Sequence, residues 1–229
     1  MAISLLQEYL QESTLFDYNS PVVKKIIQSL HLDGLSDKEK AVKLFYYVRD
    51  TIRYSVLIPK FDPEIFQASH ILQQESTFCI PKAVALATLA RGVGIPSRIH
   101  LVDFINHRLS PKLTKLWGTN VMSMHCFTEF YLDNKWVKAT AALDLETCEK
   151  HDFIPVEFDG IHDSTIKEYD KQGRKHAEYI KDHGAFADVP LELISKTFRE
   201  IYHVDSDEKL NELFNSSSKL FKNKNQNSD

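Results

Sequence analysis

The chain has 229 residues, and 28 basic against 32 acidic side chains give it a formal net charge of −4. This balance leaves no basic footprint, so nucleic acid is not an expected partner. Hydrophobic residues make up 43% and aromatic residues 11% of the chain, which argues against general disorder and suffices for one sizeable globular domain with an appendage.

The cysteines, Cys79, Cys126 and Cys148, form a small and odd set. Such a set argues against a disulfide framework. The start of the sequence does not resemble a signal peptide, and no uncharged apolar run is long enough to cross a bilayer. We therefore expect a cytoplasmic protein with free thiols and no membrane contact. A small, inert, buried side chain is the default interpretation of each thiol.

The first third of the chain predicts helices over residues 3–12, 20–34 and 36–52. A proline at position 21 fits the first turn of a helix, and Ser36 with Glu39 matches a capping box. The apolar residues of these segments recur at helical spacing and are typical of core packing. We therefore expect a helical lead-in without chemistry of its own.

The middle of the chain predicts helix, strand and hairpin in turn. Residues 53–78 are expected to be irregular, and the alanine- and leucine-rich run 79–91 predicts a buried helix that closes at glycine. Residues 97–104 predict a strand, and 106–120 a short helix or a loop. Residues 121–132 and the segment from Lys135 onward predict a β-hairpin whose turn is Asp133-Asn134.

The last third is predicted to be mostly helical. We expect a loop over residues 149–163, a polar helix over about 164–183, and helices over 191–202 and 210–221. The predicted domain covers residues 1–204, followed by a terminal helix and polar tail over 205–229. Its predicted parts are the lead-in 1–52, a catalytic core of about 53–163 and a helical part 164–204.

The candidate chemistry is a thiol paired with an imidazole. Pro81 belongs in a first helical turn, so Cys79 lies at the helix entrance. Unpaired N–H groups and the positive end of the helix dipole favour a thiolate there, so we expect a lowered Cys79 pKa. His125 follows in the next strand but one and is the candidate general base, although a satisfied core histidine is the alternative.

Other site types lack their residues. Cys148 and His151 are a weak pair, and four convergent zinc ligands cannot be assembled. With 7 glycines the chain carries no phosphate-binding loop or dinucleotide fingerprint, and no G-x-S-x-G elbow. We expect neither a metal nor a cofactor.

The order of these pieces resembles the transglutaminase-like superfamily. The matching pieces are the Cys79 helix, Gly94-Ile95-Pro96-Ser97-Arg98, His125 with Thr128, Glu129 and Tyr131, and Trp136-Val137. The resemblance implies a papain-like α+β fold in which the cysteine helix packs on an antiparallel sheet, here with helical additions at both ends. It also implies a Cys-His-Asp triad, with Cys79 as nucleophile and His125 as base, that forms a thioester.

The chain departs from the family pattern at three positions. Phe78 stands where the family usually has glycine, and Phe127 where it usually has tryptophan. The family's acid usually lies four residues after the tryptophan of the second strand, and that position is Thr140 here.

The third triad member is therefore open between two residues. If the hairpin pairing continued, His125 would face Ala142, and both Thr140 and Asp144 would be its diagonal neighbours on one sheet face. The family position favours Thr140, whereas only Asp144 carries a charge that could balance an imidazolium. We predict Asp144, with Thr140 as a secondary polar contact.

Two further residues are candidates for supporting roles. Gln73 precedes Cys79 by the interval at which papain-like enzymes carry an oxyanion-hole glutamine, although a solvated loop side chain explains it equally well. Glu129 is expected to be a structural partner of Arg91 or Arg98 and is given no catalytic role.

The sequence therefore predicts a thiol-dependent peptidase, amidase or acyltransferase that acts on a protein, peptide or other amide. The alternative is a binding or scaffold protein of the same fold with a degenerate triad. The substrate, the acyl acceptor and the oligomeric state have no sequence signal.

Overall fold

The first helices begin at the predicted caps. The computed structural model describes residues 6–58 and 60–222, and here α2 spans Pro21–Ser29 and α3 spans Asp37–Thr51. Ser20 accepts the N–H of Val23, and both bonds of the Ser36–Glu39 capping box are present. In the segment predicted as the first helix, Gln7–Leu10 forms the 3-10 turn η1, and residues 3–5 lie outside the described residues.

The antiparallel sheet has the strand order β5–β4–β3–β6. Its strands are β3 (Ser97–Asn106), β4 (Val121–Leu132), β5 (Lys135–Ala139) and β6 (Ala177–Phe186). The predicted hairpin is confirmed: Leu132 lies opposite Lys135, and the turn residues Asp133 and Asn134 have φ values of 47° and 64°. Positive φ at both turn positions is the type I′ geometry that matches strand twist.

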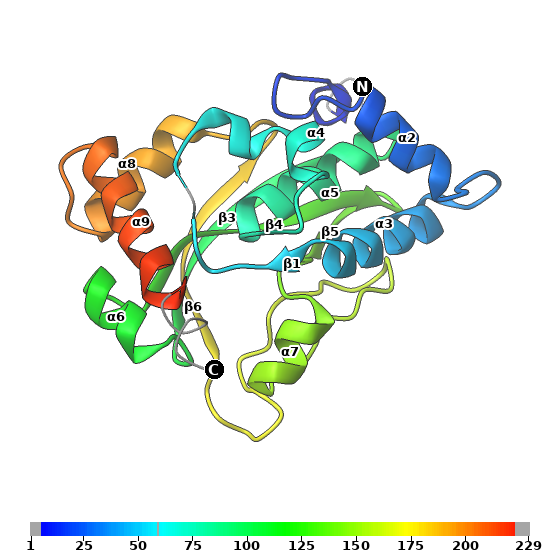
Figure 1. Ribbon diagram of the computed structural model, residues 1–229. Coiled ribbons are helices and arrows are strands. Elements are labelled where there is room, and N and C mark those ends of the chain that lie inside the picture. Colours follow the sequence, from blue (N-terminus) through cyan, green and yellow to red (C-terminus); the bar gives the residue numbers. More distant parts are fainter. Residues whose placement is uncertain (1–5, 59, 223–229) are drawn as a thin grey trace.

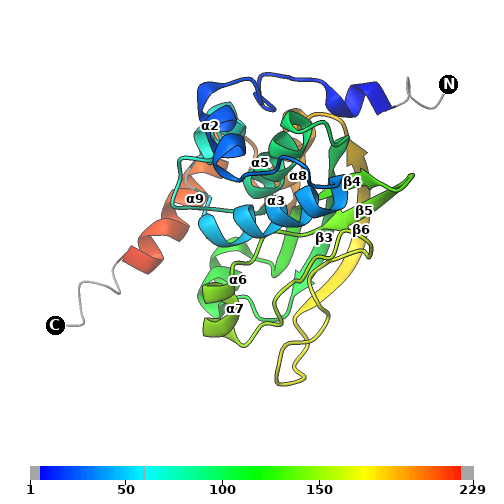
Figure 2. The same cartoon turned by 90° about the vertical axis from the view of Figure 1, so that its right-hand side faces the viewer.

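The cysteine-bearing helix α5 (Cys79–Gly92) packs on one face of this sheet, with α3 against it (Figures 1 and 2). A direct bond joins the two layers, because the Thr128 hydroxyl of β4 donates to the Ala83 carbonyl at 2.9 Å. The parallel pair β1 (Arg53–Tyr54) and β2 (Ser76–Thr77), η2 (Pro63–Phe66) and α4 (Ala68–Ile71) precede α5. The predicted fold class, an α+β core with the cysteine helix on an antiparallel sheet, is confirmed.

One predicted element is wrong. The segment 164–183 contains no helix and instead enters β6, which pairs antiparallel with β3 at the edge of the sheet. Exposed edge strands carry charged residues that block further pairing. This polarity is the reason that the sequence predicts a polar helix here. A short helix, α7 (Leu145–His151), also reaches into the segment predicted as a loop from residue 149.

The remaining helices contact one another, and α8 (Leu191–Ile201) also contacts β4. α8 and α9 (Asp207–Lys222) match the two predicted C-terminal helices, and α9 contacts α6 (Pro111–Trp117). The Trp117 indole N–H donates to the Ser217 hydroxyl at 2.8 Å, which fixes α9 on α6. The predicted tail over 223–229 lies outside the described residues. Over residues 6–58 and 60–222, no helix has the length and apolarity needed to cross a membrane.

An ion-pair cluster ties the strands together on the sheet. Glu129 accepts from Arg98 at 2.5 Å and lies 2.9 Å from His100, which is also 2.7 Å from Asp182 of β6. Burial disfavours the charged form of His100, but the two carboxylates outweigh it and raise the His100 pKa. The predicted structural pairing of Glu129 with Arg98 is confirmed, and this glutamate joins β4 to β3.

Candidate functional site

Cys79 is the first residue of α5, and only 7% of its surface is exposed. Burial raises the pKa of its thiol to about 11, although the N–H groups of Cys126, Ile80 and Cys79 itself act to lower it. The expected lowering of this pKa is therefore wrong for this structure, because removal from water outweighs the helix entrance. The thiol nevertheless lies where backbone N–H groups of α5 and β4 converge.

His125 is buried in β4, with 2% of its surface exposed. Its ring packs edge-on against Phe104, with centroids 5.0 Å apart. Burial, followed by the charge of His176, lowers the His125 pKa to about 3. The imidazole is therefore neutral at physiological pH, which is the state a general base requires.

The two candidates approach the same stretch of β4. His125 pairs with Val102 and Cys126 with Leu101 across the β3–β4 ladder, so these successive side chains leave opposite faces of the strand. The Cys79 thiol meets the strand at the Cys126 N–H. Among the described residues, no hydrogen bond joins Cys79 to His125; Tyr54 lines the same cavity as His125, and the Cys79 charge contributes to raising the Tyr54 pKa. The thiol and the imidazole are both neutral, and the thiol meets β4 at the residue that follows His125.

A bulge directly before His125 sets where this residue lies. The β3–β4 register shifts between Val102 and Phe104, and Met124 has a φ of 55°. The buried Asp103 accepts from the Ser123 hydroxyl and the Met124 N–H, both at 2.9 Å. Bulges re-aim side chains near functional sites. Asp103 thus fixes the backbone that carries His125.

Asp144 is used as a helix cap. Its carboxylate accepts from the Thr147 N–H at 2.9 Å, the Thr147 hydroxyl at 2.8 Å and the Tyr54 N–H at 2.6 Å. Burial opposes ionisation, but these bonds and the Lys82 charge lower the Asp144 pKa. β5 ends at Ala139, so the pairing that would have set Ala142 opposite His125 does not form. The structure brings Asp144 to Tyr54 rather than to His125.

The two accessory candidates, Thr140 and Gln73, differ in burial and in hydrogen bonding. The Thr140 hydroxyl and His125 Nε2 are both buried, and neither has a hydrogen-bond partner within the described part of the chain. Gln73 is exposed and donates to the Ser69 carbonyl at 2.8 Å, so its amide is engaged with its own α4 turn. The Thr140 hydroxyl is therefore without a partner in the described residues, whereas the Gln73 amide N–H is bonded within its own segment.

A buried lysine stands one turn after the thiol. Lys82 is fully buried, and its ammonium donates to the carbonyls of Arg49, at 2.9 Å, and Ile52 at the end of α3. Burial lowers the Lys82 pKa to about 7, against the charges of Asp144 and Asp50, which raise it. The side chain closes the C-terminal end of α3 against α5, so it supports the β1 segment that follows α3.

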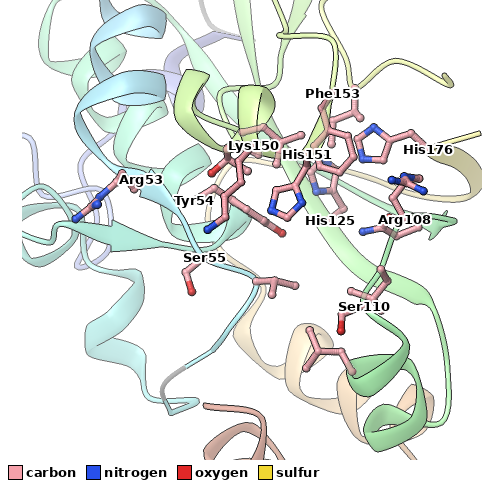
Figure 3. Close-up of a pocket in the computed structure, with 18 of the residues that line it drawn as sticks. Arg53, Tyr54, Ser55, Arg108, Ser110, His125, Lys150, His151, Phe153 and His176 are labelled. Atoms are coloured by element: carbon pink, nitrogen blue, oxygen red, sulfur yellow. Dashed lines mark hydrogen bonds between the residues drawn. The ribbon is translucent and has the colours of Figure 1, made fainter. Parts of the chain in front are cut away.

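A cavity of about 680 Å³ opens beside His125. Tyr54, His151, Phe153 and His176 surround it with His125 (Figure 3). Phe153 stacks between the two outer imidazoles, with centroids 3.8 Å from His176 and 5.5 Å from His151. These rings form one rigid wall of the pocket.

Sequence reasoning missed most of this pocket. Its lining comes from β1, the end of β3 and the segment after it, β4, α7 and the residue before β6, and no local pattern links these segments. Lys82 did give a signal, because it is a charged residue inside an otherwise apolar helix run. Among residues 6–58 and 60–222, no group of three or more His, Cys, Asp or Glu side chains could hold a metal ion.

The comparisons with known proteins give a family. The sequence profile of the transglutaminase-like superfamily matches residues 24–141, which is more than half of the chain. A solved structure of a proposed cysteine protease from Cytophaga hutchinsonii is similar, with 14% sequence identity and a TM-score of 0.46. That alignment covers 76% of this chain and 63% of the other, less than two-thirds of its length. No curated protein sequence matches the chain significantly.

Proposed function

Because this chain belongs to the transglutaminase-like superfamily, we propose that it is a thiol-dependent enzyme that forms a thioester between Cys79 and an acyl group. The observation that carries the proposal is the meeting of the α5 entrance, which bears Cys79, with the stretch of β4 that bears His125. A protein, peptide or other amide would supply the acyl group.

In the proposed reaction, the Cys79 sulfur attacks the acyl carbon while His125 takes the thiol proton. The resulting oxyanion faces N–H groups at the start of α5, which stabilise charge that develops there. The carbon–nitrogen bond then breaks, and the imidazolium returns the proton to the leaving amine. Water or a second amine then attacks the thioester carbon while His125 takes its proton, the carbon–sulfur bond breaks, and the proton passes to the released Cys79 sulfur; the product is an acid or a new amide respectively.

The protonation states favour proton transfer during attack over a preformed ion pair. With a thiol pKa of about 11 and an imidazole pKa of about 3, both groups are neutral before the substrate binds. We assign Asp144 a positioning role through the Tyr54 backbone. Thr140 stays a proposed polar contact for His125 during the reaction, because its hydroxyl is buried and uncommitted to any other partner in the described residues, although it is not bonded to the His125 ring in this structure.

The second candidate function is a binding protein that has lost turnover. It is favoured by Thr140, which stands at the family's acid position, and by the missing hydrogen bond between Cys79 and His125 in the described structure. Such a protein would keep the fold and the pocket without acylating Cys79. Selective thiol chemistry therefore separates the two functions.

Labelling with a peptidyl acyloxymethyl ketone tests the proposal. We expect the probe to modify Cys79 about 100-fold faster than Cys126 or Cys148, because the Cys79 thiol lies at a helix entrance where three backbone N–H groups converge and is the proposed partner of His125. All three thiols are buried, so burial alone would not select among them. Peptide mass spectrometry gives the site and rate of labelling.

Two controls make the result decisive. Cys79→Ser should abolish the fast labelling and leave the slow labelling of the other cysteines unchanged. Labelling in urea should modify all three thiols at similar rates, since the selectivity then comes from the fold. Equal rates in the folded protein, or no labelling at Cys79, would favour the binding protein.

A further inference from the structure

The pocket beside His125 is positively charged, although the whole chain carries a formal charge of −4. Its charged lining residues are Arg53, Arg108 and Lys150 against the single acid Glu146. Two of the cations face the pocket from different elements, Lys150 from α7 and Arg108 from the segment after β3 (Figure 3). Substrates would therefore meet a cationic surface at the proposed site.

These cations differ in how far the protein pairs them, and Arg53 lies 3.7 Å from Glu75. Among the described residues, Lys150 forms no ion pair. Arg108 lies 3.5 Å from Asp170, but that carboxylate is already held at 2.7 Å by Arg174. Glu146 forms no ion pair within the described part of the chain either. Arg174 also lies 3.1 Å from Asp152, so the two guanidinium groups face two carboxylates, and Lys150 is the lining cation left without an acidic partner in the described residues.

The pKa values of the pocket histidines respond to burial and to charges of both signs. Burial, then Lys150 and Arg108, lower the pKa of His151 against Asp152. Burial lowers the His176 pKa to about 4 against Asp170, with a smaller contribution from Arg108. The rings are therefore neutral at pH 7, and the stacked wall of His151, Phe153 and His176 holds them rigidly in place.

The inner end of the pocket carries an unused polar atom. His125 lines the cavity, is 2% exposed, and its Nε2 has no partner within the described residues. A buried polar atom without a partner costs free energy unless a ligand or water satisfies it. The cavity lining therefore includes a buried histidine with an unpaired nitrogen as well as basic side chains.

We propose that this pocket binds a carboxylate of the peptide substrate between Lys150 and Arg108, so that the site selects acidic peptides. The inference rests on the proposed function, since it assigns a substrate class to the same site. A carboxylate there would gain charge-assisted hydrogen bonds from a lysine and a guanidinium group. The acyl carbon of the same peptide would then lie toward His125.

Equilibrium binding tests the inference without turnover. The probes are a fluorescent tetrapeptide amide with two glutamates and its twin with two glutamines, measured by anisotropy with the Cys79→Ala protein. We expect the acidic peptide to bind about tenfold more tightly at low salt, and we expect salt to remove most of this preference.

Matched variants locate the effect. Lys150→Gln and Arg108→Gln should each weaken acidic-peptide binding about 3- to 10-fold and leave the neutral twin unchanged. Arg108→Lys, which keeps the charge next to Asp170, should retain most of the binding. Lys25→Gln, at an exposed lysine on α2, is the control and should have no effect.

The outcomes separate this inference from the proposed function. Equal binding of the two peptides, or no response to Lys150→Gln, overturns the inference even if Cys79 is labelled selectively. Inorganic phosphate that competes at the same concentration as the acidic peptide also overturns it, since the pocket is then a general anion site. Acidic-peptide preference without Cys79 labelling supports the pocket assignment and contradicts only the enzymatic function.

Discussion

Replacement of His125 by alanine is expected to slow the acylation of Cys79 by about 100- to 10,000-fold. The thiol pKa of about 11 leaves only about one part in 10⁴ as thiolate at pH 7. Attack therefore depends on a base that removes the proton, and His125 is the base we propose. Stopped-flow or quenched labelling with the peptidyl probe measures the rate.

The pH dependence of this reaction follows from the neutral state of His125. Because burial lowers its pKa to about 3, the imidazole stays unprotonated when the pH falls from 7 to 5. The wild-type acylation rate should therefore hold across this range, whereas a base of ordinary pKa would lose activity below about pH 6.5. His162→Ala, at an exposed histidine paired with Asp159, is the matched control and should leave rate and profile unchanged. An unaltered rate in His125→Ala would remove this residue from the mechanism.

Substitution of Lys82 by methionine is expected to lower the free energy of unfolding by about 2–4 kcal/mol. Methionine preserves most of the volume, but the carbonyls of Arg49 and Ile52 lose their donor inside the protein. Urea unfolding at pH 8 measures the change. Lys25→Met, on the exposed face of α2, should change stability by less than about 0.5 kcal/mol.

Lys82 should also make the free energy of unfolding depend on pH. Its folded pKa of about 7 lies below the unfolded value of 10.5, so between these values the unfolded chain binds the extra proton. Stability should therefore rise by about 2 kcal/mol from pH 7 to 9 in the wild type, and it should fall again as the pH is lowered toward 7. The Lys82→Met protein should lack this rise. An equal rise in both proteins would assign it to another group.

Local signals predicted the elements around the site. The Ser36–Glu39 capping box, Pro21 and the Asp133-Asn134 turn each depend on neighbours within a few residues, and each forms as predicted. The placement of Cys79 at a helix entrance follows from Pro81 in the same way. Short-range chemistry therefore sufficed for the helix starts and the hairpin.

Long-range contacts determine the features of the site that the sequence did not predict. The hairpin register predicted a diagonal approach of Asp144 to His125, but β5 leaves the ladder after Ala139. Ala139 then bridges to Ser164, and Asp144 turns to the Tyr54 N–H, 90 residues earlier in the chain. No sequence pattern near Asp144 predicts the Tyr54 N–H as its partner.

Burial was the second limit. A helix entrance favours a thiolate, but the raised Cys79 pKa comes from the side chains that cover it, and these belong to distant segments. The edge strand β6 was missed for a related reason. Its exposed charged residues do not alternate with apolar ones, because its position in the sheet is set by pairing with β3.

The central claim is that Cys79 becomes acylated with the help of His125. The most direct measurement is the mass of the folded protein after incubation with a p-nitrophenyl ester of an N-acetylated amino acid, followed by peptide mapping. The account predicts one acyl group on Cys79 that neutral hydroxylamine removes, and its loss in both Cys79→Ser and His125→Ala. Acylation confined to lysines, or spread evenly over Cys79, Cys126 and Cys148, would contradict it.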